Sequence, residues 1–249
     1  MCVKNISILG CGWLGFSLAT NLLKNNILVK GSTTNLKKLK LLKENSIDPY
    51  QIDIADDSID LSSFLKTEIL IISITSKNIK NYKHLIQKIE AANIKKVIFI
   101  SSTSVYISEN KTVTEKSPTN NLPLKQLENL FIANTNFKTT IIRFAGLYGY
   151  DRQPCFFHKS GAIIKNPEGF VNLIHRDDCI KIILAIIQKN IFGNVFNACS
   201  DFHPKRRDFY MQEKIKNGLP KPIFDEQSSL SYKIINSDKL KKQINLNTI

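Results

Sequence analysis

The sequence ISILGCGWLG at residues 6–15 decides the fold, because it joins an apolar run to a glycine-rich turn and the start of a helical pattern. Residues 6–9 predict a strand, and residues 13–24 predict a helix closed by two asparagines. The spacing G-x-G-x-x-G at residues 10–15 directly follows the strand and opens the helix. This is the context that a dinucleotide-binding loop requires.

Each glycine of this loop has its own predicted task. Gly10 allows the tight turn, Gly12 lets a pyrophosphate approach the backbone, and Gly15 lets the helix pack closely on the strand. The helix N-terminus supplies N–H groups and partial positive charge to the phosphates. We therefore predict that a dinucleotide is bound by Gly10, Gly12, Trp13, Leu14 and Gly15. The alternative is that the glycines serve only a tight turn.

Apolar runs alternate with helical patterns along most of the chain. Further strands are expected at residues 27–30, 50–54, 68–74, 96–101, 139–144 and 194–198, and further helices at 36–43, 82–92, 123–132 and 177–189. Several runs are apolar throughout, which is typical of parallel strands covered by helices on both faces. The order predicts an α/β fold: a doubly wound parallel-sheet Rossmann fold with a small C-terminal substrate-side region.

The amino-acid composition of the sequence changes after residue 149. Residues 150–171 hold prolines and glycines with aromatic residues between them, and predict a long loop on the substrate side. Residues 203–249 are polar and hold three further prolines. We predict an NAD(P)-binding domain over residues 1–200 and a small cap packed on it over residues 201–249.

The choice between NAD and NADP depends on the end of the second strand. An NAD site usually has an Asp or Glu about 20 residues after the glycine loop, where it binds the ribose 2′-OH. No carboxylate occurs in residues 16–43, and the expected position falls within residues 31–35, which include the hydroxyls of Ser32, Thr33 and Thr34. These hydroxyls, with the lysines at residues 37–38, suit a 2′-phosphate, so we expect NADP to be preferred over NAD. The alternative for the lysines is a solvated helix face.

Five charged residues carry predictions of their own. Asp53 ends the third expected strand, where it would contact the adenine edge or cap the next turn. Arg143, in an apolar strand, needs a partner, either in a structural ion pair or in a substrate. Asp177 is expected to cap the helix that follows it. Arg206 and Arg207 are interpreted as solvated surface, with a substrate anion as the alternative.

The net charge of +14 raises the question of nucleic-acid binding. Only five of the 35 basic residues are arginine, the residue preferred for phosphate and base contacts. Lysine, asparagine and isoleucine are abundant throughout, as an AT-rich genome would produce. We predict a solvated basic surface and no specific nucleic-acid partner.

The cysteines and the N-terminus bear on location. Cys2, Cys11, Cys155, Cys179 and Cys199 form no C-x-x-C pair and are odd in number, which fits a reducing cytoplasm and no structural zinc. The apolar stretch over residues 6–23 is interrupted by glycines and polar residues, so it predicts neither export nor a membrane span. We expect a cytoplasmic location and no membrane partner. The sequence leaves the oligomeric state unknown.

Four later segments resemble motifs of extended short-chain dehydrogenase/reductases, the NAD-dependent epimerase/dehydratase family. They are FISSTSVY at residues 99–106, RFAGLYG at 143–149, NLIHRDD at 172–178 and VFNA at 195–198. With the glycine loop they span residues 6 to about 200 in the family's order. The loop spacing and the short chain are most similar to the atypical branch of this superfamily.

The resemblance implies a catalytic role for Ser102 and also shows a gap. The family uses a Ser or Thr four residues before the motif tyrosine to hold the substrate oxygen, and Ser102 has that position. The alternative is a hydroxyl that closes the strand. The family's acid or base is a tyrosine whose pKa is lowered by a lysine four residues later. No tyrosine occurs in residues 107–147, and Asn121 stands four residues before Lys125, so the dyad is missing.

Substitute acids lie in segments that the family places near the nicotinamide. They are Tyr148, Tyr150, His158 and His175, with ordinary packing as the alternative for each. We take Tyr148 as the second catalytic candidate, and His175 with Arg143 as candidate substrate contacts.

Together these features predict an NAD(P)-dependent oxidoreductase or epimerase-like enzyme acting on a small carbonyl or sugar-like substrate. Hydride would move between C4 of the nicotinamide and a carbon near Ser102. The missing dyad supports the alternative, a non-catalytic NADP-binding sensor or regulatory protein. A classical two-domain dehydrogenase would leave the segment at residues 101–106 unexplained.

Overall fold

A computed structural model describes residues 3–245 of the protein, and seven strands in this range form one sheet. The strand order is β11-β7-β5-β4-β1-β2-β3, and the pairings from β3 to β5 are parallel. The strands are β1 (Asn5–Leu9), β2 (Leu28–Thr33), β3 (Asp48–Gln51), β4 (Ile69–Ile72), β5 (Lys96–Ser102), β7 (Lys138–Phe144) and β11 (Val195–Ala198).

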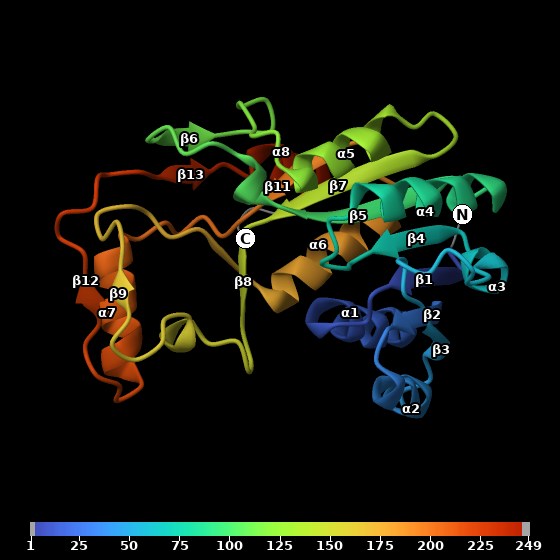
Figure 1. The fold of residues 1–249 in the computed structure, drawn as a ribbon, viewed down its shortest axis with the longest axis horizontal. Helices are drawn as coiled ribbons and strands as arrows, with labels where there is room; N and C mark the ends of the chain where they lie inside the picture. The colour runs from blue at the N-terminus through green and yellow to red at the C-terminus, as the bar shows by residue number, and fades with distance from the viewer. Residues whose placement is uncertain (1–2, 246–249) are drawn as a thin grey trace. The chain divides into compact units, whose positions relative to one another are not determined.

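Helices cover both faces of this sheet, with α4 and α5 on one side and α1 and α6 on the other (Figure 1). The helices are α1 (Trp13–Lys24), α2 (Leu36–Glu44), α3 (Ser62–Leu65), α4 (Ile79–Ala91), α5 (Pro123–Ala133), α6 (Arg176–Gln188), α7 (Arg206–Lys216) and α8 (Asp238–Ile244). In α1, the buried residues Leu14, Leu18 and Leu22 recur every fourth position and form its packed stripe.

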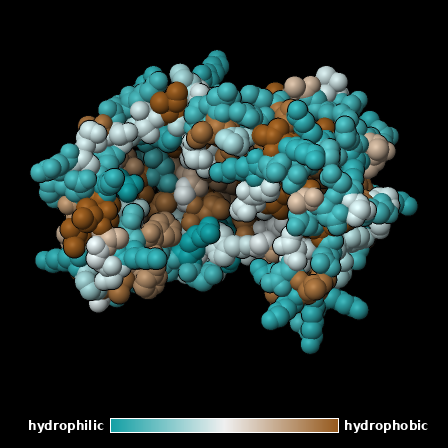
Figure 2. All heavy atoms as spheres, viewed as in Figure 1, coloured by the Kyte–Doolittle hydropathy of each residue, from teal (hydrophilic) through white to brown (hydrophobic). Residues whose placement is uncertain are grey.

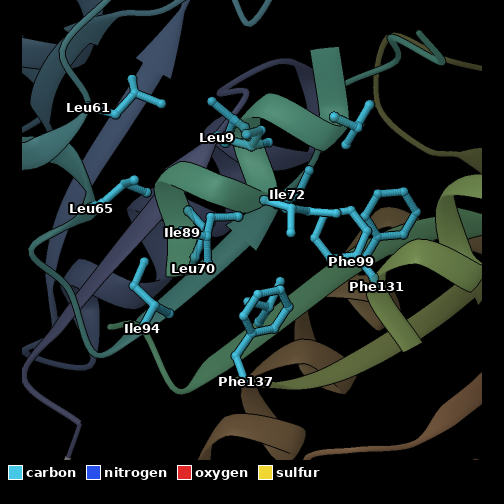
Figure 3. Close-up of a cluster of buried hydrophobic side chains, with 14 of the residues drawn as sticks. Leu9, Leu61, Leu65, Leu70, Ile72, Ile89, Ile94, Phe99, Phe131 and Phe137 are labelled. Atoms are coloured by element: carbon cyan, nitrogen blue, oxygen red, sulfur yellow. The ribbon is translucent and has the colours of Figure 1, made fainter. Parts of the chain in front are cut away.

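A buried hydrophobic cluster joins the sheet to α3, α4 and α5 (Figure 3). Leu70, Ile72 and Phe99 of β4 and β5 belong to it and are almost fully buried. The rings of Phe99 and Phe131 pack with centroids 4.9 Å apart, and Tyr82 meets both edge-on. This packing fixes β4 and β5, whose ends carry candidate site residues.

The chain divides into two compact units, each discontinuous in sequence. Unit 1 comprises residues 1–101, 121–143 and 180–196, and unit 2 comprises residues 102–120, 144–179 and 197–249. The cap expected over residues 201–249 therefore belongs to a unit that also takes in the motif segments around residues 102–106 and 144–179.

Unit 2 is built from short paired strands and α7. The pairs are β8 (Gly146–Tyr148) with β10 (Leu173–His175), β9 (Ile163–Ile164) with β12 (Ile223–Phe224), and β6 (Lys111–Val113) with β13 (Lys233–Ile235). Two 3-10 turns, η1 (Thr103–Val105) and η2 (Pro154–Phe156), and helix α8 also belong to it. Tyr210 of α7 packs against Ile164 and Val171 in a small buried cluster.

The predicted fold class is confirmed, and several predicted boundaries are wrong. Strand β2 continues to Thr33, because its end is buried and bonded to the glycine loop. Strand β3 covers residues 48–51 rather than 50–54; it lies at the sheet edge, where Pro49 is tolerated. Residues 150–171, expected to form one loop, contain η2 and β9.

The cysteines and the helices add two observations about the described residues. Cys11, Cys155, Cys179 and Cys199 are buried free thiols, while Cys2 lies outside the described range. No helix within residues 3–245 is both long and apolar enough to cross a membrane.

Candidate functional site

A pocket of about 350 Å³ in unit 1 lies at the carboxyl ends of β1, β2, β3 and β4. It is lined by residues 9–12, 32–35, 38, 52–54 and 73–76. The chain runs outward from β1 to β3, then returns to β4 on the other side of β1. The pocket therefore lies at the topological switch point, where open α/β sheets bind their ligands.

The glycine loop has a backbone geometry that other residues would strain. Gly10 has φ +101°, a left-handed conformation, and a Cβ there would lie 2.7 Å from the carbonyl oxygen of Ser73. A Cβ on Gly15 would lie 2.2 Å from the carbonyl oxygen of Gly10. The first turn of α1 therefore packs directly on the loop, as predicted for the third glycine.

Gly12 is different, because a Cβ there would meet no protein atom within 4 Å. Gly12 lines the pocket and is the N-cap of α1, with no side chain to accept hydrogen bonds from the first-turn N–H groups. Trp13 is half-buried, and the side chain of Leu14 is buried in the core. The open space beside a helix N-terminus fits a diphosphate, which needs close backbone approach and N–H donors.

Ser32 and Thr33 line the pocket, and their hydroxyls hold its walls. The Ser32 Oγ accepts a hydrogen bond from the Gly10 N–H at 2.9 Å, and Thr33 Oγ1 accepts from the Asn35 N–H at 3.1 Å. Thr34 is exposed. Burial raises the pKa of the Cys11 thiol to about 12, so this pocket residue is uncharged near neutral pH.

Sequence reasoning missed part of the lining. Ser73 and Ser76 contribute to the pocket, but the apolar run at residues 68–74 hid the strand end at Ile72. Their place after the strand next to β1 is the signal that would have found them. Asn35, the N-cap of α2, lies in the stretch expected to contact the ribose but was not assigned to the site, and of the two expected lysines only Lys38 lines the pocket.

Asp53 lies two residues beyond the end of β3 and lines the pocket. Its Oδ1 accepts a hydrogen bond from the Ala55 N–H at 2.9 Å. Asp53 therefore caps the turn, as one of the two interpretations predicted. Its second carboxylate oxygen can still accept a hydrogen bond from a ligand. Asp53 is the only acidic residue among the described residues that line this pocket.

Arg143 lies in a buried ion pair rather than at a ligand site. Its Nε and Nη2 donate to the Glu128 carboxylate at 2.9 and 2.6 Å, and both side chains are at most 3% exposed. Ser101 Oγ donates to the same carboxylate at 2.6 Å, and Lys125 Nζ lies 3.3 Å from it. The structural alternative for Arg143 therefore accounts for this residue, and a substrate contact is not needed.

The region of the missing dyad has its own local structure. Helix α5 begins at Pro123, so Asn121 lies before the helix and outside the face that carries Lys125. The Lys125 ammonium is already beside Glu128. A tyrosine at residue 121 would therefore not be set against Lys125 by helical spacing.

Ser102 ends β5, where its Oγ accepts a hydrogen bond from the Ser104 N–H at 3.1 Å and caps η1. Ser102 thus has the alternative role predicted for it, a hydroxyl that closes the strand. A hydroxyl that accepts one hydrogen bond keeps its own proton for another acceptor, so a role toward a substrate oxygen stays a prediction.

Tyr148 and His175 are brought together in unit 2. They are register partners of β8 and β10, and their rings lie 5.2 Å apart. Burial, followed by the charges of Asp178 and Glu213, raises the pKa of Tyr148 above its ordinary value. A phenol with a raised pKa stays protonated near neutral pH, so it is suited to donate a hydrogen bond and is poorly suited to act as a base.

A strained aromatic segment adjoins His175. Tyr150 has φ 56°, and its hydroxyl donates to both oxygens of Asp177 at 3.0 and 2.9 Å. The Arg176 guanidinium lies 3.9 Å from the Tyr150 ring centroid. Asp177 lies inside α6 rather than capping it, and His175 Nδ1 accepts from its N–H at 3.3 Å.

Comparison with known proteins finds a relative in sequence. The chain is 31% identical over 239 residues to Protein YeeZ of Escherichia coli, and the match covers 89% of this chain and 87% of YeeZ. No family model matches the sequence.

Solved structures share the fold. A functionally unknown conserved protein from Silicibacter pomeroyi has a TM-score of 0.81 at 20% identity, covering 98% of this chain and 93% of that chain. UDP-glucuronic acid 4-epimerase from Bacillus cereus, in complex with NAD, has a TM-score of 0.80 at 21% identity, covering 98% of this chain and 93% of that one. The fold resemblance predicted from the ordered motifs is confirmed.

Proposed function

The chain belongs to the YeeZ family and has the Rossmann fold of short-chain dehydrogenase/reductases, and from this premise we propose that it is an NADP-dependent oxidoreductase or epimerase-like enzyme. The observation that carries the proposal is the open space beside Gly12 in a pocket at the topological switch point. We assign it a small carbonyl or sugar-like substrate, in keeping with solved neighbours such as the NAD-bound UDP-glucuronic acid 4-epimerase.

The glycine loop would hold the diphosphate of the dinucleotide. The open space beside Gly12 leaves room for it, and the N–H groups of Leu14 and Gly15 belong to the first turn of α1, which has no intrahelical acceptors for them. Asp53 would contact the adenine edge with its free carboxylate oxygen. When bound, a nicotinamide supplies the hydride donor or acceptor.

The preference for NADP rests on the end of β2. Thr34 is exposed there, Asn35 is the N-cap of α2, and Lys38 is exposed and lines the pocket. A 2′-phosphate would gain charge-assisted hydrogen bonds from these groups. A carboxylate at the same place would repel it, and β2 carries none.

Chemistry is assigned to Ser102 and Tyr148, both in unit 2. Each would donate a hydrogen bond to the substrate oxygen, since the Ser102 proton is not used in its capping bond and the Tyr148 phenol stays protonated. His175 would hold the Tyr148 ring in place through its edge-on contact.

A second candidate function is a non-catalytic NADP sensor. The specific observation in its favour is the engagement of Lys125 with Glu128, which removes the one lysine near the family's dyad position.

The expectations of a cytoplasmic location and of no specific nucleic-acid partner stay predictions from composition.

Single-turnover oxidation of bound NADPH separates the two functions. The protein is mixed with NADPH and with an aldehyde, a ketone, a keto acid or a UDP-4-keto-sugar, each of which can accept hydride, and absorbance at the reduced-nicotinamide band is followed. We expect slow oxidation with at least one member of the panel. Tight NADPH binding without oxidation by any of them would overturn the enzyme in favour of the sensor.

A further inference from the structure

A second pocket, of about 370 Å³, lies wholly within unit 2 and has no place in the proposed reaction. It is lined by residues 156, 158–162, 164, 214 and 219–223, which come from the segments around η2, β9, α7 and β12. None of the described residues that line it is acidic, whereas His158, Lys159, Lys214 and Lys221 are basic.

Lys214 is the unusual member of this set, because only 7% of it is exposed. Its Nζ donates to the carbonyl oxygen of His158 at 3.2 Å, and an ammonium has three donors. At the start of the same helix, the exposed N-cap Lys205 and the partly exposed Arg207 pair with Glu168, whose carboxylate lies 2.8 and 2.9 Å away. These two cations thus have a carboxylate partner, while within the described chain the buried Lys214 has a carbonyl.

Within residues 3–245, no carboxylate forms an ion pair with Lys214, and a second cation, Arg206, acts on the same histidine as Lys214 does. The Arg206 guanidinium and the His158 ring both lie against the ring of Tyr210, at 5.6 and 4.7 Å. His158 Nε2 is buried with no hydrogen-bond partner within residues 3–245. Burial, then the charges of Arg206 and Lys214, lowers the pKa of His158. A buried cation among such groups lacks the anion that usually accompanies it.

The rim of the pocket is apolar and exposed. Phe156 is 66% exposed and Ile223 is 53% exposed, and Ile223 pairs with Ile163 of β9, itself 63% exposed. Hydrophobic side chains gather over β9 and β12 in Figure 2. Adjacent exposed apolar side chains are typical of a surface that a ligand covers.

We propose that this pocket binds a small organic carboxylate with an apolar tail. The carboxylate lies on the Lys214 ammonium, with Lys159 and Lys221 at the mouth, and the tail covers Phe156 and Ile223. Binding here does not depend on the dinucleotide pocket in unit 1. The proposed carboxylate site is therefore independent of whether the protein catalyses a reaction.

Calorimetric titration with octanoate tests the site on the full-length protein, with acetate and octanol as probes that lack the tail or the charge. We expect saturable binding of octanoate, at least about tenfold tighter than either comparison probe. Lys214→Met should weaken octanoate binding about tenfold or more, while Lys216→Met, an exposed lysine two residues on, should change it less than twofold. Gly12→Val should bind octanoate as the wild type does.

Thermal denaturation of each variant checks that it is folded. If Lys214→Met does not fold, the double variant Lys159→Gln with Lys221→Gln replaces it, and the same loss of octanoate affinity is expected. Octanoate binding that is unchanged in a folded Lys214→Met protein would overturn the proposal. So would octanol binding as tightly as octanoate, or no saturable binding of octanoate to the wild type.

Discussion

The loop after β1 and the segment after β5 both follow a buried strand of the same sheet, yet they are built differently. The loop is defined by backbone geometry: Gly10 is left-handed and Gly15 touches the Gly10 carbonyl oxygen. The segment is defined by side chains with ordinary partners, as Ser101 bonds to Glu128 and Ser102 caps η1. The chain thus has the backbone geometry of a glycine loop, although it lacks the family's tyrosine–lysine dyad.

The largest effect expected from this difference comes from Gly12→Val. A branched side chain would fill the space beside the N-terminus of α1, and NADPH binding should fall below detection. The fold should persist, because a Cβ at this position meets no protein atom. Calorimetry and thermal denaturation measure the two quantities.

Gly15→Ala is the matched control, with the opposite expectation for stability. Its Cβ would lie 2.2 Å from a backbone oxygen, so the variant should lose about 1–3 kcal/mol of unfolding free energy or more. A stable Gly15→Ala protein, or a Gly12→Val protein with wild-type affinity, would contradict the assignment of tasks within the loop.

Ser102→Ala tests the other region. If the chain is an enzyme, loss of a hydrogen bond to the substrate oxygen should lower kcat/KM by about 10²-fold, with NADPH affinity unchanged. Ser104→Ala, which removes an exposed hydroxyl two residues away, should leave kcat/KM unchanged. Equal activity of Ser102→Ala and the wild type would reduce Ser102 to a strand terminus.

Lys38→Gln should produce a smaller change that is specific to one cofactor. NADPH affinity should fall about tenfold, equivalent to about 1.4 kcal/mol, while NADH affinity should stay the same. Lys37 does not line the pocket, so Lys37→Gln should affect neither cofactor. A similar loss for both cofactors in Lys38→Gln would indicate a general charge effect instead of a 2′-phosphate contact.

Asn121→Tyr should have the smallest effect. It recreates the family's spacing with Lys125, but residue 121 precedes α5 and Lys125 is engaged by Glu128. Single-turnover rates of variant and wild type should therefore agree within twofold. A clear gain in rate would show that Lys125 can leave Glu128 and serve a tyrosine.

The same two regions show which structural features could be predicted from the sequence. The glycine loop and α1 were predictable, because glycine spacing, strand and helix patterns agree over residues 6–24. Ser73 and Ser76 were not, since an apolar run does not show where its strand ends. An ion pair for Arg143 was foreseen, but its partner Glu128 was not, because it lies 15 residues away on another element. Contacts between elements depend on packing that the sequence does not display.

Calorimetric titration of the wild-type protein with NADPH and then, in a separate sample, with NADH tests the central claim most directly. The claim is that the pocket at the ends of β1 to β4 holds a nicotinamide dinucleotide and favours its 2′-phosphate form. We predict saturable binding of one NADPH per chain, about tenfold or more tighter than NADH. No saturable binding of either dinucleotide would contradict the assignment of the pocket, and tighter binding of NADH would contradict the role given to the end of β2.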